Sequence, residues 1–307
     1  MNFQRKRQLK EVNAQKYNYF LDEKQERSSR RIFVIFLIIL ICVFAAVFSV
    51  DVYFQKNYDY ITINGLSMQP TLNPEPVYIN GKSVQDGVYI KKGTDADYSD
   101  IIIVDKRDDI GKTVIKRLLG KGGDKISILR LNIDGESQYR FLRIKSGTSS
   151  VEVLNETYIS GKCNNSYGES RVLGYSSWTS GVSATYDLGN YYEGQFYSTY
   201  LWNSKTNHVV TDNVYKYNIV YQGTEYNNVK FYQLGQDKIF YMGDNRAESS
   251  DARATGSEDQ SKIIGKVVAV THNSTSSKNS FFYLFNRAIG YFEVLWQEIV
   301  RIFAWKG

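Results

Sequence analysis

Three stretches of the chain carry side chains whose types and spacing could support nucleophilic chemistry. The first is residues 64–72, in which Ser67 stands between two bulky apolar residues. Gly65 permits a sharp turn two residues before the serine, and Pro70 fixes φ three residues after it. Such a turn can hold the Ser67 hydroxyl at the end of a strand, within reach of a substrate. Taken alone, a serine turn of this kind is usually an ordinary surface turn, so the interpretation depends on the other two stretches.

The second stretch, residues 113–120, has the composition of an apolar strand with Lys116 at its centre. Strand alternation places Val114, Lys116 and Leu118 on one face, so the lysine has aliphatic neighbours. Burial disfavours the ammonium form and lowers the pKa of a lysine, which a lysine needs in order to act as a base near neutral pH. The alternative for this stretch alone is a lysine on the rim of an edge strand.

The third stretch, residues 241–253, is a polar loop. Asp251 and Arg253 are close enough in sequence to pair, and the Ser249 hydroxyl could orient a nearby amine. The three stretches therefore offer a nucleophile, a base and polar groups to position them.

In this order the stretches resemble the bacterial type I signal peptidases, which are membrane-anchored endopeptidases with a Ser–Lys dyad that remove signal peptides from exported proteins. The resemblance covers roughly residues 30–130 and 235–275. The family's serine box, strand box, lysine box and G-D-N-R-x-x-S-x-D-x-R box are matched by residues 67–72, 100–104, 116–124 and 243–253.

The resemblance implies a role for each matched side chain. Ser67 would be the nucleophile, and Lys116, neutral when active, would be the general base. Ser249 would orient Lys116, and Asp251 with Arg253 would hold the last box in shape. The substrates would be secretory preproteins with small residues at the first and third positions before the cut. No cofactor, metal or nucleic acid is expected, whereas membrane lipid and the protein export machinery are expected partners.

The oxyanion hole would rest on the Ser67 backbone N–H and a second donor that the sequence does not identify. Gly65 stands where some family members carry a serine that contributes to the hole. The other departures from the family pattern remove no catalytic group. They are Ser99, Gly122, Ala252 and Thr255.

Two other classes of function are weighed against the peptidase. A non-catalytic relative could act as a chaperone or assembly factor for surface proteins, but such a protein could lose the dyad, and both Ser67 and Lys116 are present. A surface adhesin that uses the Tyr- and Asn-rich middle region would leave the three stretches unexplained.

An N-terminal anchor must position these stretches. Residues 32–50 are nineteen residues without a charge, long enough for one transmembrane helix. Residues 1–31 hold nine Lys and Arg against four acidic residues, a charge of +5, and such a tail is predicted to be mobile with some helix. The positive flank places the N-terminus in the bacterial cytoplasm and the rest outside the cytoplasmic membrane. A cleaved signal peptide is the alternative, but Ala45 and Ala46 lie inside the run instead of after it.

The remaining chain is predicted to be mainly β. An antiparallel catalytic domain is expected over residues 57–130 and 232–275, interrupted by an inserted β-rich lobe at 131–231. The lobe either contacts substrate or a partner or, as we favour, only packs on the core. The expected strands are 60–63, 77–79, 88–90, 101–104, 114–119, 126–129, 138–144, 196–202, 217–222, 229–234, 238–242 and 263–270.

The C-terminal region, residues 278–307, is predicted to form an amphipathic helix over 281–305. An in-plane position at the membrane interface is favoured, with a spanning helix and a helix packed on the domain as alternatives. The predicted apolar face includes Phe292, Leu295, Trp296 and Ile299, and the predicted polar face includes Gly290, Glu293 and Gln297.

Overall fold

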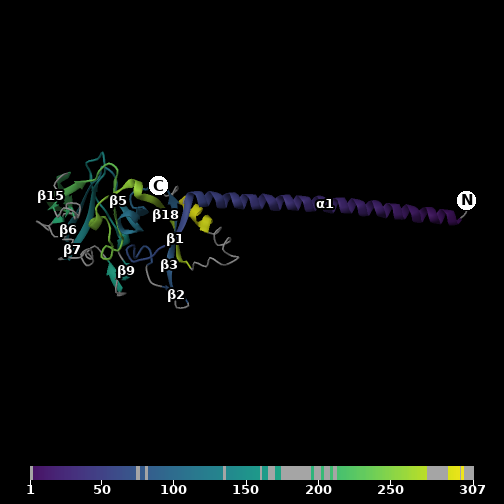
Figure 1. Ribbon diagram of the computed structural model, residues 1–307, viewed down its shortest axis with the longest axis horizontal. Coiled ribbons are helices and arrows are strands. Elements are labelled where there is room, and N and C mark those ends of the chain that lie inside the picture. The colour runs from purple at the N-terminus through teal and green to yellow at the C-terminus, as the bar shows by residue number, and fades with distance from the viewer. Residues whose placement is uncertain are drawn as a thin grey trace. The chain divides into compact units, whose positions relative to one another are not determined.

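The computed structural model contains two compact units, residues 1–56 and 57–307, each described here by itself (Figure 1). The residues that the structure describes are 3–73, 77–79, 82–133, 136–159, 161–164, 170–173, 195–196, 202–203, 208–209, 213–274, 290–297 and 299–300.

The first unit is a single helix, α1 (Phe3–Asn57). Its segment Gln25–Asn57 is long and apolar enough to cross a membrane and contains the predicted anchor at 32–50. The helix also runs through the basic tail, which we expected to be mobile with some helix. Lys, Arg, Gln and Glu are strong helix formers, and Glu26 pairs with Arg30 one turn later at 3.2 Å.

The second unit contains a large sheet in which all described pairs are antiparallel. β2 (Val77–Ile79) pairs with β3 beside the main strand path. The path runs through β1 (Tyr58–Thr62), β3 (Lys82–Lys92), β18 (Ile263–Ser274), β4 (Ile101–Lys106), β5 (Lys112–Gly120), β16 (Lys238–Met242) and β17 (Glu258–Asp259).

A second antiparallel sheet lies at the other end of this unit from β1, β3 and β18 (Figure 1). β11 (Gln195–Phe196) pairs with its strand β6, and the pairs β9 (Gly161–Asn164)–β10 (Ser170–Leu173) and β12 (Trp202–Asn203)–β13 (His208–Val209) stand apart. The strand order is β14 (Val214–Tyr221), β15 (Thr224–Gln233), β6 (Lys125–Ile133), β7 (Glu136–Ile144) and β8 (Val151–Val153). The short helices are α2 (Arg107–Ile110), η1 (Thr157–Ile159), α3 (Ala252–Thr255) and η4 (Gln260–Lys262).

The prediction of a mainly antiparallel β protein behind an N-terminal apolar helix is confirmed. The expected strands that the structure describes in full each overlap an observed one, because alternating apolar runs mark strands strongly. The expected strand at 196–202 lies mostly outside the described residues.

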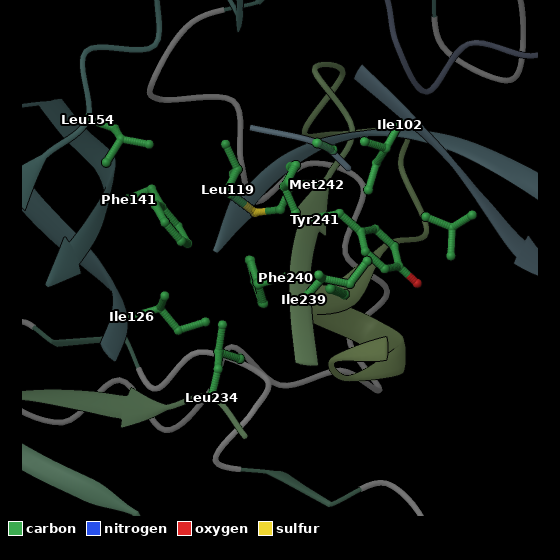
Figure 2. Packing of buried hydrophobic residues seen from close by; sticks show 14 of the residues in the cluster. Ile102, Leu119, Ile126, Phe141, Leu154, Leu234, Ile239, Phe240, Tyr241 and Met242 are labelled. Carbon is green, nitrogen blue, oxygen red and sulfur yellow. The ribbon is translucent and has the colours of Figure 1, made fainter. Parts of the chain in front are cut away.

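One hydrophobic cluster joins the two sheets. Phe141 of β7 stacks on Phe240 of β16, with ring centroids 5.4 Å apart, and Leu154 lies beside Phe141 (Figure 2). Leu118 and Met242 belong to the same cluster. The segment that we assigned to an inserted lobe therefore supplies part of the core under the large sheet.

The C-terminal region is helical at residues 290–297 and 299–300, and the rest of the predicted helix lies outside the described residues. Gly290 is buried against Tyr89 of β3, where a side chain on the glycine would collide with the tyrosine ring. Tyr291 and Val294 are also buried. Gly290, which we placed on the polar face, is thus a contact residue.

This shared core predicts that the two sheets unfold together. Replacing the fully buried Phe141 with Ala should destabilise the whole unit by about 3–5 kcal/mol, because it removes a stacked ring and leaves a cavity. Urea unfolding of the full chain in detergent, followed by fluorescence and by circular dichroism, measures this loss.

The matched control is Tyr215→Ala, at a more exposed site in the second sheet, which should change stability much less. Two separate transitions in Phe141→Ala, with only one of them shifted, would contradict a common core.

Candidate active site

The serine turn is fixed by the residues on both sides of Ser67. Met68 and Leu72 are buried in a cluster with Ile63 and with residues of β3 and β4. At the end of the turn, Asn73 N donates to Asp86 Oδ2 and Asp86 N donates to Asn73 Oδ1, both at 2.7 Å. The turn is therefore held at its apolar side chains and at its last residue, while Ser67 itself remains partly exposed.

Lys116 lies in β5, opposite Ile102 of β4, and its side chain reaches the serine. Lys116 Nζ lies 2.8 Å from Ser67 Oγ and donates to the carbonyl oxygen of Ile115 at 2.9 Å. Val114, Leu118 and Ile102 all belong to or pack on the first core cluster, as the strand alternation predicted for the first two. The structure thus brings together the two residues that were singled out from separate stretches.

The environment of Lys116 favours the neutral amine. Only 4% of the residue is exposed, and burial lowers the pKa of Lys116 to about 8. The Asp251 carboxylate opposes this shift, and the Arg253 guanidinium adds to it. A lysine with this pKa is unprotonated in a large fraction of molecules slightly above neutral pH.

The last box packs directly under the serine turn. Asn245 N donates to Ser67 O at 3.0 Å, and Asn245 Nδ2 donates to Leu66 O at 3.1 Å. A side chain on Gly243 would collide with Ser67 O and with Ser249 Oγ, so this close approach requires glycine. Each of these contacts fixes the position of the turn that carries Ser67.

Ser249 is brought to the site but does not bind the lysine. Its Oγ is buried, and no hydrogen bond to Lys116 is formed within the described residues. The expected hydrogen bond is missing because Lys116 Nζ is directed to Ser67 Oγ and Ile115 O instead.

Asp251 and Arg253 form the expected pair in a buried position. Arg253 Nε donates to Asp251 Oδ1 at 2.9 Å, and Gly243 N donates to Asp251 Oδ2 at 2.9 Å. Burial alone would raise the pKa of Asp251, but the Arg253 guanidinium and the Gly243 N–H outweigh it and hold this pKa below its usual value. Arg253 Nη2 also donates to Arg246 O at 2.9 Å, so the pair links the end of the loop to its middle.

Asp244 connects all three stretches, a role that was not predicted from the sequence. Arg117 Nε, one residue after Lys116, donates to Asp244 Oδ1 at 2.8 Å. The Thr71 hydroxyl, in the serine turn, donates to Asp244 Oδ2. Asp244 is fully buried, and a buried carboxylate needs a charge partner and hydrogen-bond donors. Here both come from the two other stretches.

A second buried ion pair extends this network into the segment that we assigned to the lobe. Arg246 Nη1 donates to Glu156 Oε2 at 3.1 Å, and Tyr158 donates its hydroxyl proton to Glu156 Oε1 at 2.7 Å. The Arg117 guanidinium lies 3.9 Å from the centre of the Tyr158 ring. Burial raises the pKa of Tyr158, and Glu156 adds to that shift, so this hydroxyl stays protonated.

The Ser67 backbone N–H, expected in the oxyanion hole, has no acceptor within the described part of the chain. Gly65 is exposed with φ of 108°, and a side chain there would meet nothing within 4 Å. Space is therefore open beside Gly65, two residues before Ser67.

The chain matches a protein-family model. A family model described as signal peptidase, peptidase S26, matches residues 30–272, which include the three stretches and the middle region. No curated protein matches the chain.

The Glu156–Arg246 pair predicts a large loss of stability when one partner loses its charge. Glu156→Gln removes the carboxylate that pairs directly with the buried guanidinium of Arg246, which should cost about 3–5 kcal/mol. The measurement is urea unfolding of the full chain. The matched control is Asp108→Asn, which removes an exposed partner of Lys262 and should cost at most about 1 kcal/mol. Equal losses in the two variants would contradict the role assigned to burial.

Proposed function

The chain belongs to the signal peptidase family, peptidase S26, and we propose that it is a serine endopeptidase that removes N-terminal signal peptides from exported preproteins. The membership and the apolar helix support a membrane signal peptidase. The Ser–Lys mechanism and the identity of the substrates are the proposed part. The observation that carries the proposal is the 2.8 Å separation of Lys116 Nζ and Ser67 Oγ at a buried lysine.

In the proposed first step, neutral Lys116 takes the proton from Ser67 Oγ while this oxygen attacks the carbonyl carbon before the scissile bond. The resulting tetrahedral oxyanion accepts a hydrogen bond from the Ser67 backbone N–H, with the second donor, near Gly65, unassigned. Lys116 then returns the proton to the leaving amine, so the peptide bond breaks and an acyl-enzyme remains.

In the second half, Lys116 removes a proton from a water molecule that attacks the acyl ester. The ammonium then gives its proton to Ser67 Oγ as the serine leaves, which restores the starting state. No histidine or metal is required in these reaction steps. Asp251 and Arg253 hold the loop under the turn, and Ser249 is proposed to orient Lys116 once a substrate is bound.

The first prediction for this mechanism concerns the lysine itself. Lys116→Arg should be as inactive as Ser67→Ala, because a guanidinium stays protonated and cannot take the serine proton. The measurement is cleavage of a preprotein by the detergent-solubilised full chain. Lys112→Arg, an exposed position in the same strand, is the matched control and should retain activity. A folded Lys116→Arg protein that still cleaves would exclude the dyad, and a folded wild type that cleaves no preprotein would favour the chaperone alternative.

The second prediction concerns pH. Because the neutral amine is the active form and the pKa of Lys116 is about 8, kcat/KM should rise through this pH to a plateau. Two pH units below the pKa, activity should be about 100-fold under the plateau, since the neutral fraction falls tenfold per unit. A flat profile between those limits would rule out the lysine as the base.

The third prediction concerns orientation, which we propose as N-terminus inside and β domain outside the cytoplasmic membrane. The charge of +5 before residue 32 supports this topology. Protease should be added to cells in which it can reach the outer face of the cytoplasmic membrane. It should digest the domain after residue 51 and spare residues 1–31. Protection of the domain with loss of the tail would reverse the orientation.

A further inference from the structure

The C-terminal helix presents an apolar stripe that the described residues leave exposed. Phe292 and Trp296 are 74% and 63% exposed, and Leu295 and Ile299 are also exposed. Their spacing of three, one and three residues places all four on one side of the helix. We call these four residues the exposed stripe. Large apolar side chains gathered on one face in this way mark an interaction surface.

The opposite side of the same helix is fixed to the β domain. Gly290 lies against the Tyr89 ring, and Tyr291 and Val294 are buried. At 100° per residue, these three positions point away from the exposed stripe. A helix seated in this way cannot be surrounded by lipid on all sides, so it does not span the bilayer as an independent helix.

The chain itself brings this helix close to a membrane. β1 begins at Tyr58, directly after the apolar helix ends at Asn57. Tyr60 pairs with Tyr89 across β1 and β3, and their ring centroids are 4.9 Å apart. Tyr60 is three residues after Asn57, so the chain can separate these two residues by at most about 10 Å. The predicted anchor ends at Val50, and seven further helical residues, about 10 Å, lead to Asn57. The covalent chain therefore holds Tyr60, and with it the seat of the C-terminal helix, within roughly 20 Å of the end of the anchor.

We propose that the exposed stripe lies in the interface of the same lipid bilayer that holds the anchor, with the helix axis in the membrane plane. Phe, Trp, Leu and Ile are the side chains that bury favourably between headgroups and acyl chains. Glu293 and Gln297 are exposed and lie outside the stripe, where they can contact water and headgroups. The second attachment restricts rotation of the β domain about its anchor. This proposal depends on the anchor and not on catalytic activity.

The test measures the depth of Trp296 in the full-length protein. Trp178, Trp202 and Trp305 are replaced with Phe, and the protein is reconstituted in phosphatidylcholine vesicles. Lipid that carries bromine near the headgroup end of its acyl chains should quench most of the Trp296 fluorescence. Aqueous iodide should quench it weakly. The matched control is Ile110→Trp in a chain whose four native tryptophans are all Phe; this exposed site in α2 should be quenched by iodide and not by the lipid.

Three outcomes would overturn the proposal. Quenching of Trp296 by iodide alone would place the stripe in water. Stronger quenching by bromine at the chain ends would indicate a spanning helix, and protection from both quenchers would indicate cover by protein, such as a second copy. If the tryptophan variants fold poorly, a polarity-sensitive dye is attached to a single cysteine instead. The labelled variants are Phe292→Cys and, as the control outside the stripe, Gln297→Cys. Both are made in a chain with Cys42 and Cys163 replaced by Ser. The emission of the dye at position 292 should then be clearly blue-shifted relative to position 297, and equal emission would contradict the proposal.

Discussion

The geometry of the site depends on one buried carboxylate, that of Asp244. Its oxygens accept from Arg117 and Thr71, so it joins the strand that carries Lys116 to the turn that carries Ser67. A fully buried carboxylate without such partners would be strongly destabilising. The three segments therefore cannot move apart without exposing this charge. Asp244 hydrogen-bonds to neither the serine oxygen nor the lysine nitrogen. It fixes the distance between them by holding together the two segments that carry them.

Burial, more than nearby charge, lowers the pKa of Lys116. Asp251 and Arg253 both lie close enough to affect its pKa, but they act in opposite directions because their charges are opposite. What remains is the removal of the ammonium from water by its apolar surroundings. The paired charges thus give the loop its rigidity without returning the lysine to its ordinary pKa.

Much of this arrangement could be predicted from the sequence, because it is determined by patterns within short stretches of the chain. The apolar run lies within nineteen consecutive residues, and the strand alternation around Lys116 and the turn residues around Ser67 each lie within about ten. The partners of Asp244 and Arg246 could not be predicted in this way. Glu156 lies 90 residues from Arg246, in a region without a recognisable motif, and no periodicity links them. A signal was nevertheless present for Arg117, a charged residue inside an apolar strand, which must have a counter-charge if it is buried.

The same network has a consequence for the order of events during synthesis. Its contacts join residues separated by 49, 90, 127 and 173 positions along the chain. Contacts of such long range form late, since the loop entropy must be overcome before any of them contributes. The anchor and the strand with the lysine leave the ribosome well before residues 244–253. If the chain acts as proposed, Ser67 and Lys116 are therefore not yet assembled while the domain is being made, and the proposed activity arises only when nearly the whole domain is complete.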